Sequence, residues 1–210
     1  MQRGRFITFE GGEGSGKTTQ VQRLAARLAP LGAEVVVTRE PGGSPGAEEL
    51  RALLVRGDAE RWSPLAETLI FYAARTDHLE RTIRPALARG AWVICDRFAD
   101  STRAYQAAGG GVSPGLIERL ETDVLGADTP DLTLFLDLPA EQGLARAGRR
   151  GGGEARFEAK DLAFHQRLRA GFHAIAEAEP ARYRRIDATS DPDGVADAVW
   201  AAVSGKFGLS

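Results

Sequence analysis

The sequence predicts an α/β fold in which a parallel five-stranded sheet carries helices on both faces. Short apolar runs alternate with helical patterns along the chain, which is typical of a doubly wound domain. Three of the runs, at 5–10, 91–96 and 131–138, are almost continuously apolar, as strands are when both faces of a parallel sheet are covered. The chain shows no internal repeat and no long linker, so residues 1–210 are expected to form one domain.

The first half of the chain supplies three of the strands. The run 5–10 predicts the first strand, and 17–32 predicts a helix with Leu24 and Leu28 on one side and Gly32 as its stop. A second strand is expected at 33–40 and a short helix at 46–56. Ser63 and Pro64 begin a long helix over 63–90, in which Pro85 is a possible kink. The run "AWVICD" at 91–96 is the third strand.

The second half predicts two more strands and the remaining helices. Helical stretches are expected at 99–107 and 114–125, and the run "DLTLFLDL" at 131–138 predicts the fourth strand. A helix begins at 140–148 and is followed by "RRGGGEAR", 149–156, which is expected to be a mobile loop because of its three consecutive glycines. A helix over 158–178, a strand at 183–188 and a closing helix over 191–204 complete the chain.

Composition and charge exclude several classes of protein. The 210 residues carry a formal net charge of −2, so no overall basic field would gather nucleic acid, and no nucleic-acid partner is expected. No apolar run approaches the length of a membrane span, and the first residues do not form a signal peptide. The single cysteine, Cys95, lies in an apolar run and allows no internal disulfide. A cytoplasmic location is therefore expected.

A glycine-rich loop between the first strand and the first helix predicts nucleotide binding. Residues 11–18, "GGEGSGKT", match G-x-x-x-x-G-K-[ST], and the strand before them and the helix after them are the required context. The fold is therefore expected to be of the P-loop NTPase type. Backbone N–H groups would hold the phosphates, with Lys17 at the β- and γ-phosphates and the Thr18 hydroxyl on Mg²⁺. The predicted ATP-binding residues are Gly11, Gly12, Glu13, Gly14, Ser15, Gly16, Lys17, Thr18 and Thr19.

A second ligand for Mg²⁺ is expected at the end of another strand. Asp96 closes the third strand and is the preferred candidate, although it could also cap the helix that follows. Asp137, at the end of the fourth strand, is the alternative. The predicted metal site therefore consists of Thr18 and Asp96.

The classes of P-loop protein can be narrowed from the sequence. A GTPase would need an Asn-Lys-x-Asp motif, and the chain contains no asparagine. A small-molecule phosphotransferase needs an acceptor pocket and a cover that excludes water. The segment of about 146–157 is predicted as that lid, because its arginines could reach the transferring phosphoryl group. A kinase of another nucleoside monophosphate or small acceptor, and a regulatory P-loop ATPase, remain alternatives.

Five motifs, in their order and spacing, resemble bacterial thymidylate kinase. They are "FEGGEGSGKTT" at 9–19, "TREPGG" at 38–43, "FYAAR" at 71–75, "CDRF" at 95–98 with "ST" at 101–102 and "AYQ" at 104–106, and "PDLTLFLD" at 130–137. The resemblance covers about residues 5–188. It implies transfer of the γ-phosphoryl group of ATP to dTMP with Mg²⁺, giving dTDP and ADP for dTTP synthesis. It also implies a homodimer.

The resemblance implies an acceptor site for dTMP. Arg97 resembles the clamp on the 5′-phosphate, which a guanidinium can grip with two hydrogen bonds. Phe71 resembles the aromatic residue that stacks on thymine, Arg75 the residue that binds a base carbonyl, and Tyr105 the ring that would clash with a ribose 2′-OH. The implied dTMP-binding residues are Glu13, Arg39, Glu40, Pro41, Phe71, Arg75, Arg97, Ser101, Thr102, Tyr105 and Gln106.

The implied catalytic residues are all cationic. Gly14 stands where some family members carry an arginine, so the chain resembles the subgroup whose catalytic arginine comes from the lid. Lys17 and Arg97 are predicted as catalytic together with the lid arginines Arg149 and Arg150. Arg146 and Arg156 are further candidates from the same segment.

No general base is expected. The phosphate of a nucleoside monophosphate is already anionic near neutral pH, so catalysis should rest on positioning and charge neutralisation. Accordingly, the helical residues His78, His165 and His173 are predicted to be surface or packing residues.

Overall fold

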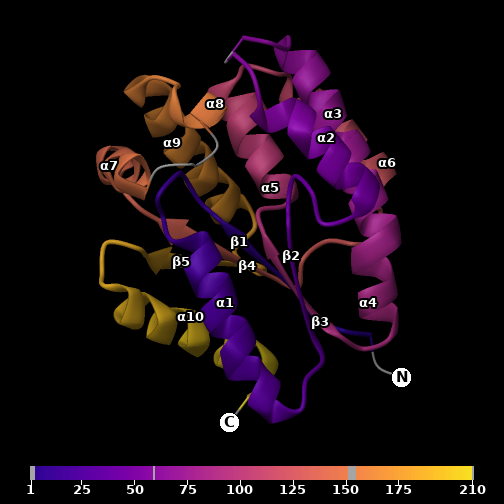
Figure 1. Ribbon diagram of the computed structural model, residues 1–210. Helices are drawn as coiled ribbons and strands as arrows, with labels where there is room; N and C mark the ends of the chain where they lie inside the picture. Colours follow the sequence, from indigo (N-terminus) through magenta and orange to yellow (C-terminus); the bar gives the residue numbers. More distant parts are fainter. Residues whose placement is uncertain (1–2, 59, 151–154, 210) are drawn as a thin grey trace.

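The computed structural model describes residues 3–58, 60–150 and 155–209, and it contains the predicted sheet. The five parallel strands lie in the order β2-β3-β1-β4-β5 (Figure 1). Their bounds are β1 Phe6–Glu10, β2 Val35–Arg39, β3 Trp92–Asp96, β4 Leu132–Asp137 and β5 Tyr183–Asp187. The fold class and all five strand positions are thereby confirmed. The carboxyl ends of the strands meet at one edge, where open α/β sheets bind their ligands.

Helices cover both faces of this sheet. The described helical segments are α1 Lys17–Leu28, η1 Ala29–Leu31, α2 Pro45–Val55, α3 Pro64–His78, η2 Leu79–Ile83, α4 Arg84–Ala88, α5 Ala99–Thr102, η3 Arg103–Gly109, α6 Pro114–Leu125, α7 Ala140–Arg150, α8 Ala155–Glu158, α9 Leu162–Ala178 and α10 Pro192–Phe207. On one face, α1 and α10 pack against alternate residues of β1 and β4. On the other face lie α3, η2, α4 and α6, with α9 and η3 beside them (Figure 1).

The alternation along β4 shows how one strand serves two cores. Leu132, Leu134 and Leu136 enter the core with α1 and α10. Phe135 points the other way, and its ring stacks on Phe172 of α9 at a centroid distance of 5.3 Å. Because successive side chains of a strand point to opposite faces, a strand buried on both sides must be apolar at nearly every position. This is the pattern that predicted the parallel sheet.

The long helix predicted at 63–90 contains a π-helical turn. Helix α3 begins after Ser63, whose side chain accepts a hydrogen bond from the Ala66 backbone N–H. The helix becomes π-helical over η2 and returns to α-helix in α4. Pro85 lies just beyond η2; its ring clashes with the carbonyl four residues earlier and it offers no N–H. Residues next to it therefore adopt a wider turn.

The segment predicted as a loop at 149–156 is partly helical. Helix α7 continues to Arg150 and α8 begins at Ala155, so the predicted loop was too long at both ends. Residues 151–154 of the predicted lid lie outside the described residues, as does the Arg150 side chain. The following helix α9 begins at Leu162, later than expected, because Asp161 caps it by accepting from the Phe164 backbone N–H at 2.7 Å.

Candidate active site

The glycine loop folds around the amine of Lys17. The loop joins the end of β1 to the start of α1, and Lys17 is the first residue of that helix. Its Nζ donates to the backbone carbonyls of Gly11 at 3.1 Å and Gly12 at 2.8 Å, and to Ser15 Oγ at 3.1 Å. Burial, followed by the charge of Arg97, lowers the pKa of Lys17 to about 8. The loop therefore holds a buried cation beside the amino end of a helix, which is an environment that binds anions.

A close approach of two backbones explains why Gly14 carries no side chain. A Cβ at Gly14 would lie 2.2 Å from the carbonyl oxygen of Gly143 on α7, and a Cβ at Gly143 would lie 2.4 Å from the Glu13 carbonyl oxygen. Gly14 also has a φ of 66°, which side chains disfavour. Helix α7 thus packs directly on the phosphate loop, and its later turns carry the lid arginines.

Two oxygen groups at the loop fit a magnesium ion. Thr18 Oγ1 donates to Asp96 Oδ2 at 2.6 Å, which joins α1 to the end of β3. Hydroxyl and carboxylate oxygens are ligands that Mg²⁺ prefers, and this ion usually takes only one or two carboxylates, with phosphates and water completing its shell. Asp137, the alternative, instead pairs with Arg169 at 2.7 Å and His173 at 3.2 Å. The residues present therefore favour Thr18 and Asp96.

Arg97 lies where the end of β3 meets the phosphate loop. Its Nη1 donates to the Gly11 carbonyl at 2.9 Å, and its Nη2 donates to Glu13 Oε1 at 2.8 Å. Tyr105 O–H donates to the same Glu13 oxygen at 2.7 Å. Arg97 has a φ of 69°, the only positive value among the described non-glycine residues. Such a backbone is costly and persists only when its surroundings hold it.

The charges of Glu13, Lys17 and Arg97 influence one another. Burial raises the pKa of Glu13, but the charges of Arg97 and Lys17 outweigh it and bring the pKa down to about 2. The three side chains are at least nine-tenths buried. A phosphate entering here would meet two cations and one carboxylate, because Glu13 offsets part of the positive charge of Lys17 and Arg97.

Glu40 joins the loop after β2 to helix α3. Arg75 donates from Nε to Glu40 Oε2 at 2.8 Å and from Nη2 to Thr102 Oγ1 at 3.0 Å. The other Glu40 oxygen lies 3.0 Å from His78 Nδ1. Arg75 Nη1 is buried and has no hydrogen-bond partner among the described residues. An unpaired buried donor is energetically unfavourable, so a ligand that offers a hydrogen-bond acceptor to Nη1 would gain binding free energy.

The remaining acceptor residues, called the acceptor wall below, come from α3, α5 and η3. Phe71 is half-buried, and its ring lies 6.3 Å from that of Phe157. Gln106 donates to Glu67 Oε1 at 3.0 Å, and Ser101 Oγ donates to Glu10 Oε2 at 2.5 Å. These contacts fix the wall through neighbouring elements.

The loop after β2 is held by helix α2. Arg39 pairs with Glu48 at 3.1 Å, and the Pro41 carbonyl accepts from Arg51 Nη1 at 2.7 Å. These contacts place the predicted "TREPGG" segment against α2.

One cavity of about 660 Å³ brings many of these residues together. It is lined by Glu13, Gly14, Ser15, Gly16, Lys17, Thr18, Thr19, Val21, Gln22, Val37, Thr38, Arg39, Glu40, Arg51, Val55, Arg56, Asp96 and Arg97. The phosphate loop, the loop after β2 and the end of β3 therefore share one opening. No predicted residue of α3, α5 or η3 is among the described lining residues. Arg75, Ser101 and Tyr105 contact lining residues through hydrogen bonds.

Sequence reasoning missed Arg51 of α2 and Arg56, which directly follows that helix; both bring a further cation to this cavity. No motif marked them, because α2 approaches the phosphate loop only in the folded chain. It also missed a second cavity of about 540 Å³ on the other side of the phosphate loop. Arg146 of α7 and the segment 188–192 after β5 line this cavity together with Gly14, Ser15 and Gly16. The only sequence signal for it was the general rule that loops at the carboxyl ends of strands form the site.

The lid arginines lie in different environments. Arg146 donates to the Ala188 carbonyl at 3.0 Å, and Arg149 is exposed on α7. Arg156 is buried; it donates to the carbonyls of Leu54 and Asp58 and pairs with Glu67. Of the two lid residues predicted as catalytic, Arg149 is exposed, and the Arg150 side chain lies outside the described part of the chain.

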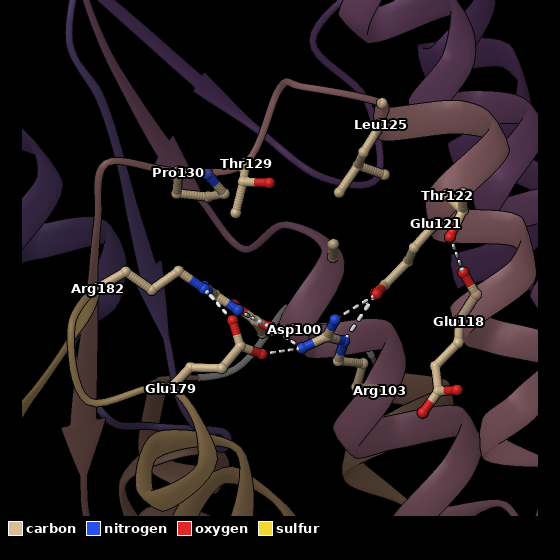
Figure 2. Close-up of a pocket in the computed structure, with 12 residues that line it drawn as sticks. Asp100, Arg103, Glu118, Glu121, Thr122, Leu125, Thr129, Pro130, Glu179 and Arg182 are labelled. Carbon is tan, nitrogen blue, oxygen red and sulfur yellow. Dashed lines mark hydrogen bonds and ion pairs between the residues drawn. The ribbon is translucent and has the colours of Figure 1, made fainter.

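Charged side chains behind the acceptor wall anchor it from the far side. Asp100 pairs with Arg182 at 2.7 Å, while Arg103 pairs with Glu121 at 2.5 Å and with Glu179 (Figure 2). These residues surround a cavity of about 280 Å³.

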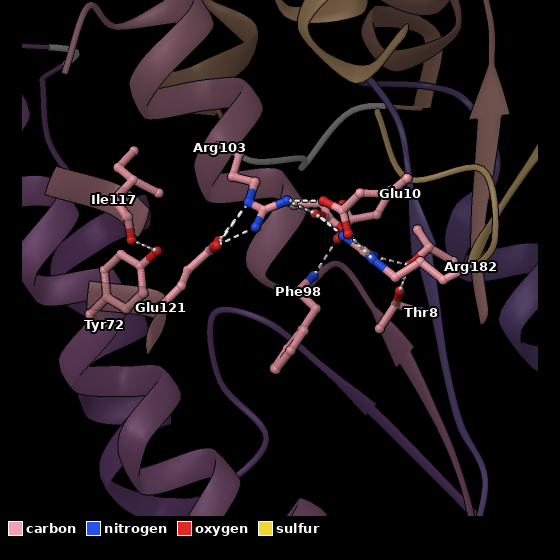
Figure 3. A network of polar contacts seen from close by, with 11 residues as sticks. Thr8, Glu10, Tyr72, Phe98, Arg103, Ile117, Glu121 and Arg182 are labelled. Carbon is pink, nitrogen blue, oxygen red and sulfur yellow. Dashed lines mark hydrogen bonds and ion pairs between the residues drawn. The ribbon is translucent and has the colours of Figure 1, made fainter. Parts of the chain in front are cut away.

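Glu10 reaches the same segment from the end of β1. Its Oε1 accepts from the Phe98 backbone N–H at 2.8 Å (Figure 3). Its other oxygen accepts from Ser101 Oγ. Burial, and then the charge of Asp100, raises the pKa of Glu10. Residues 98–103 are thus fixed on both sides, which holds Ser101 and Thr102 at the acceptor wall.

Comparison with known proteins decides the family. The thymidylate kinase family model matches residues 9–199. The chain belongs to the thymidylate kinase family. The thymidylate kinase of Caulobacter vibrioides is 62% identical over 209 residues, covering 100% of both chains. That of Bradyrhizobium diazoefficiens is 58% identical over 207 residues, covering 98% of this chain and 91% of its own. The crystal structure of thymidylate kinase from Ehrlichia chaffeensis has a TM-score of 0.80 at 35% identity, covering 96% of this chain and 99% of that one.

These similarities confirm the predicted family, the P-loop NTPase-type fold and the enzyme class. A thymidylate kinase is a nucleoside monophosphate kinase and binds nucleotides, so the chain is a transferase. The alternative of a regulatory ATPase is not supported by the family match. No helix in the described residues is long and apolar enough to cross a membrane.

Proposed function

We propose that the protein transfers the γ-phosphoryl group of ATP to dTMP, giving dTDP and ADP on the route to dTTP. The observation that carries this proposal is Arg75 Nη1, a buried donor without a partner in the described residues. The guanidinium is held by Glu40 of the loop after β2 and by Thr102 of α5. An unpaired buried N–H costs about 1–3 kcal/mol. A carbonyl oxygen of a pyrimidine base would satisfy it, and Phe71, one turn earlier on α3, would supply the stacking surface.

The cationic residues account for binding and transfer. The backbone of 11–16 and Lys17 hold the donor phosphates, and Arg97 grips the acceptor phosphate beside Glu13. The acceptor oxygen is already anionic, so positioning and charge neutralisation suffice. Magnesium, held by Thr18 and Asp96, would neutralise charge on the donor phosphates. Of the two lid arginines predicted as catalytic, Arg149 is the one whose side chain is described, and it is exposed near the end of α7; Arg146, earlier on the same helix, lines a cavity with the phosphate loop.

The second cavity supports the placing of ATP. Its walls, Arg146 and the segment 188–192, continue from the phosphate loop on the side away from β2. An adenine could lie there while its phosphates reach Lys17. The acceptor would then occupy the cavity on the β2 side, where Arg39, Glu40 and Pro41 line or support the wall.

A panel of monophosphates tests the proposal. Coupled detection of ADP with dTMP, dCMP, dGMP and AMP as acceptors is expected to give fast turnover with dTMP alone. Equal rates with another monophosphate would assign a different acceptor. Slow ATP hydrolysis that ignores every acceptor would overturn the kinase proposal.

We also propose a homodimer formed through α3. Leu65 and Leu69 lie one turn apart on this helix and are each 48% exposed. Such an apolar pair on a helix surface is suited to a second copy of the chain. Sedimentation of the protein and of Leu65→Arg tests it: the dimer should dissociate in the variant. A monomeric native protein would refute it.

We also propose a single-domain organisation and a cytoplasmic location for the protein. We infer one kinase domain over 1–210, with a lid at about 146–157 that includes Arg146, Arg149 and Arg156. Cooperative unfolding by both circular dichroism and fluorescence would support one domain. A cytoplasmic location agrees with the use of ATP, and cell fractionation tests it.

A further inference from the structure

A chain of buried hydrogen bonds leads from β2 to Arg75 through a histidine that no motif singled out. Thr38 Oγ1 lies 2.6 Å from His78 Nε2, and His78 Nδ1 lies 3.0 Å from Glu40 Oε1. Glu40 Oε2 accepts from Arg75 Nε at 2.8 Å. His78 is 0% exposed and Glu40 5% exposed. The sequence predicted His78 as a surface or packing residue; it is buried, but both of its ring nitrogens are hydrogen-bonded.

The partners select one tautomer of the ring. A carboxylate can only accept, so His78 Nδ1 carries the proton and donates it to Glu40. His78 Nε2 then accepts from the Thr38 hydroxyl. Since the identity of the group on Nε2 decides which nitrogen is protonated, Thr38 helps to keep the Nδ1 proton aimed at Glu40.

Glu40 in turn fixes the plane of a guanidinium. Arg75 is held at two points, by Glu40 through Nε and by Thr102 through Nη2. These two contacts leave Nη1 as the donor without a described partner. If Glu40 lost its contact with His78, its carboxylate could rotate about the bond to its side chain. Arg75 would then lose the fixed direction of Nη1.

The surrounding backbone leaves His78 little freedom. A Cβ at Gly43 would lie 2.4 Å from His78 Nε2 and 2.3 Å from Thr38 Oγ1. The loop after β2 therefore closes over the ring and the threonine together. The position of this loop, which supplies Glu40 and Pro41, depends on the same contact.

We propose that His78 is a positioning residue for acceptor-base selection, acting on Glu40 through Nδ1 and through Glu40 on the plane of Arg75. The inference rests on the proposed dTMP kinase activity. It assigns the selection of a base carbonyl to residues of three separate elements, β2, the loop after it, and α3. His78 touches no nucleotide in this arrangement.

Two substitutions of His78 test the roles of its two ring nitrogens separately. In His78→Asn the amide nitrogen takes the place of Nδ1 and keeps the donor to Glu40. In His78→Gln the longer amide reaches the place of Nε2, keeps the contact with Thr38, and loses Glu40. Steady-state kinetics would be measured for both, with dTMP and dCMP as acceptors, because cytosine carries an amino group where thymine has a carbonyl.

The two variants are expected to differ in KM for dTMP and in their preference for dTMP over dCMP. His78→Gln should raise KM for dTMP roughly tenfold, as the loss of one charge-assisted hydrogen bond predicts. Its KM for ATP should change less than about twofold, and its kcat/KM ratio of dTMP to dCMP should fall. His78→Asn should stay within about threefold of the native enzyme on each measure.

Other outcomes would overturn the inference. Equal losses in the two variants, or an equal rise in KM for ATP and dTMP, would show that His78 only fills space. If His78→Gln does not fold, Thr38→Val replaces it: the ring loses its second anchor, and KM for dTMP should rise alone, whereas an unchanged KM would refute the role. A native enzyme that is inactive with dTMP would instead refute the proposed function itself.

Discussion

Arg97 and Glu13 form a buried ion pair, 2.8 Å from Nη2 to Oε1, which joins the end of β3 to the phosphate loop. The residue proposed to grip the acceptor phosphate is therefore anchored in the loop proposed to hold the donor. Binding of one nucleotide would change the charge that the other meets, because Lys17 also acts on the same carboxylate.

Loss of the Arg97 guanidinium should weaken the acceptor more than the donor. In Arg97→Ala we expect KM for dTMP to rise at least tenfold, because a charge-assisted hydrogen bond to phosphate contributes about 1.5–3 kcal/mol. KM for ATP should change much less. Initial-rate kinetics check this, with Arg89→Ala as the control, since Arg89 forms an exposed pair with Glu34. A defect confined to ATP would reverse the assignment of the two sites.

Lys17 should be needed for turnover but not for acceptor binding. Lys17→Ala is expected to bind dTMP in calorimetry with little change and to lose turnover by about a hundredfold or more. Because the pKa of Lys17 is lowered to about 8 in the free protein, kcat/KM for ATP should fall as pH rises through about 8. Native turnover in the alanine variant would exclude Lys17 from the reaction.

Glu13 should make the protein sensitive to acid. Its pKa falls from 4.5 to about 2 on folding, so its contribution to stability is present above pH 4.5 and disappears as pH falls toward 2. A shift of this size corresponds to roughly 3 kcal/mol. Urea unfolding at pH 7 and pH 3 should show a smaller loss in Glu13→Gln than in the native protein. Equal losses would mean that other carboxylates govern the acid response.

Tyr105 should discriminate against ribose through its ring and hold Glu13 through its hydroxyl. Tyr105→Phe removes the hydroxyl that donates to Glu13 but keeps the ring, and it should keep the preference for dTMP over its ribonucleotide counterpart. Tyr105→Ala removes the ring, and we expect that preference to fall by about tenfold. The ratio of kcat/KM for the two acceptors is the measurement. A lost preference in the phenylalanine variant would assign discrimination to the hydroxyl.

Much of the fold could be predicted because its signals are local. The apolar run of β4, and the glycine loop with the strand and helix beside it, can each be recognised from a short stretch of sequence. The extent of the lid could not be predicted, because the glycines after Arg150 indicate a loop while α7 is supported by its packing on Gly14. The π-helical turn before Pro85 was not predicted either, because a proline inside a helical pattern indicates a kink or an end without specifying a wider turn.

The site was predicted in its parts but not in its connections. Lys17, Thr18 and Asp96 lie together as expected, because strand ends meet at one edge. His78 lies 40 positions after Thr38 and 38 positions after Glu40 in the sequence. No spacing rule predicts contacts over such a separation. The pairing of Asp100 with Arg182 spans 82 positions. Such contacts follow from tertiary packing, so a charged residue's partner could not be predicted from its neighbours.

The order of the strands also sets the distance between the two edge strands, β2 and β5. The loop after β2 and the loop after β5 line cavities on opposite sides of the phosphate loop, and these strands are the two edges of the sheet. Neighbouring strands are about 4.8 Å apart, so four intervals span about 19 Å. Both cavities are also lined by Gly14, Ser15 and Gly16 beside the central strand. A synthetic molecule that tethers a purine to a pyrimidine would therefore have to pass the phosphate loop and would span less than the full width of the sheet.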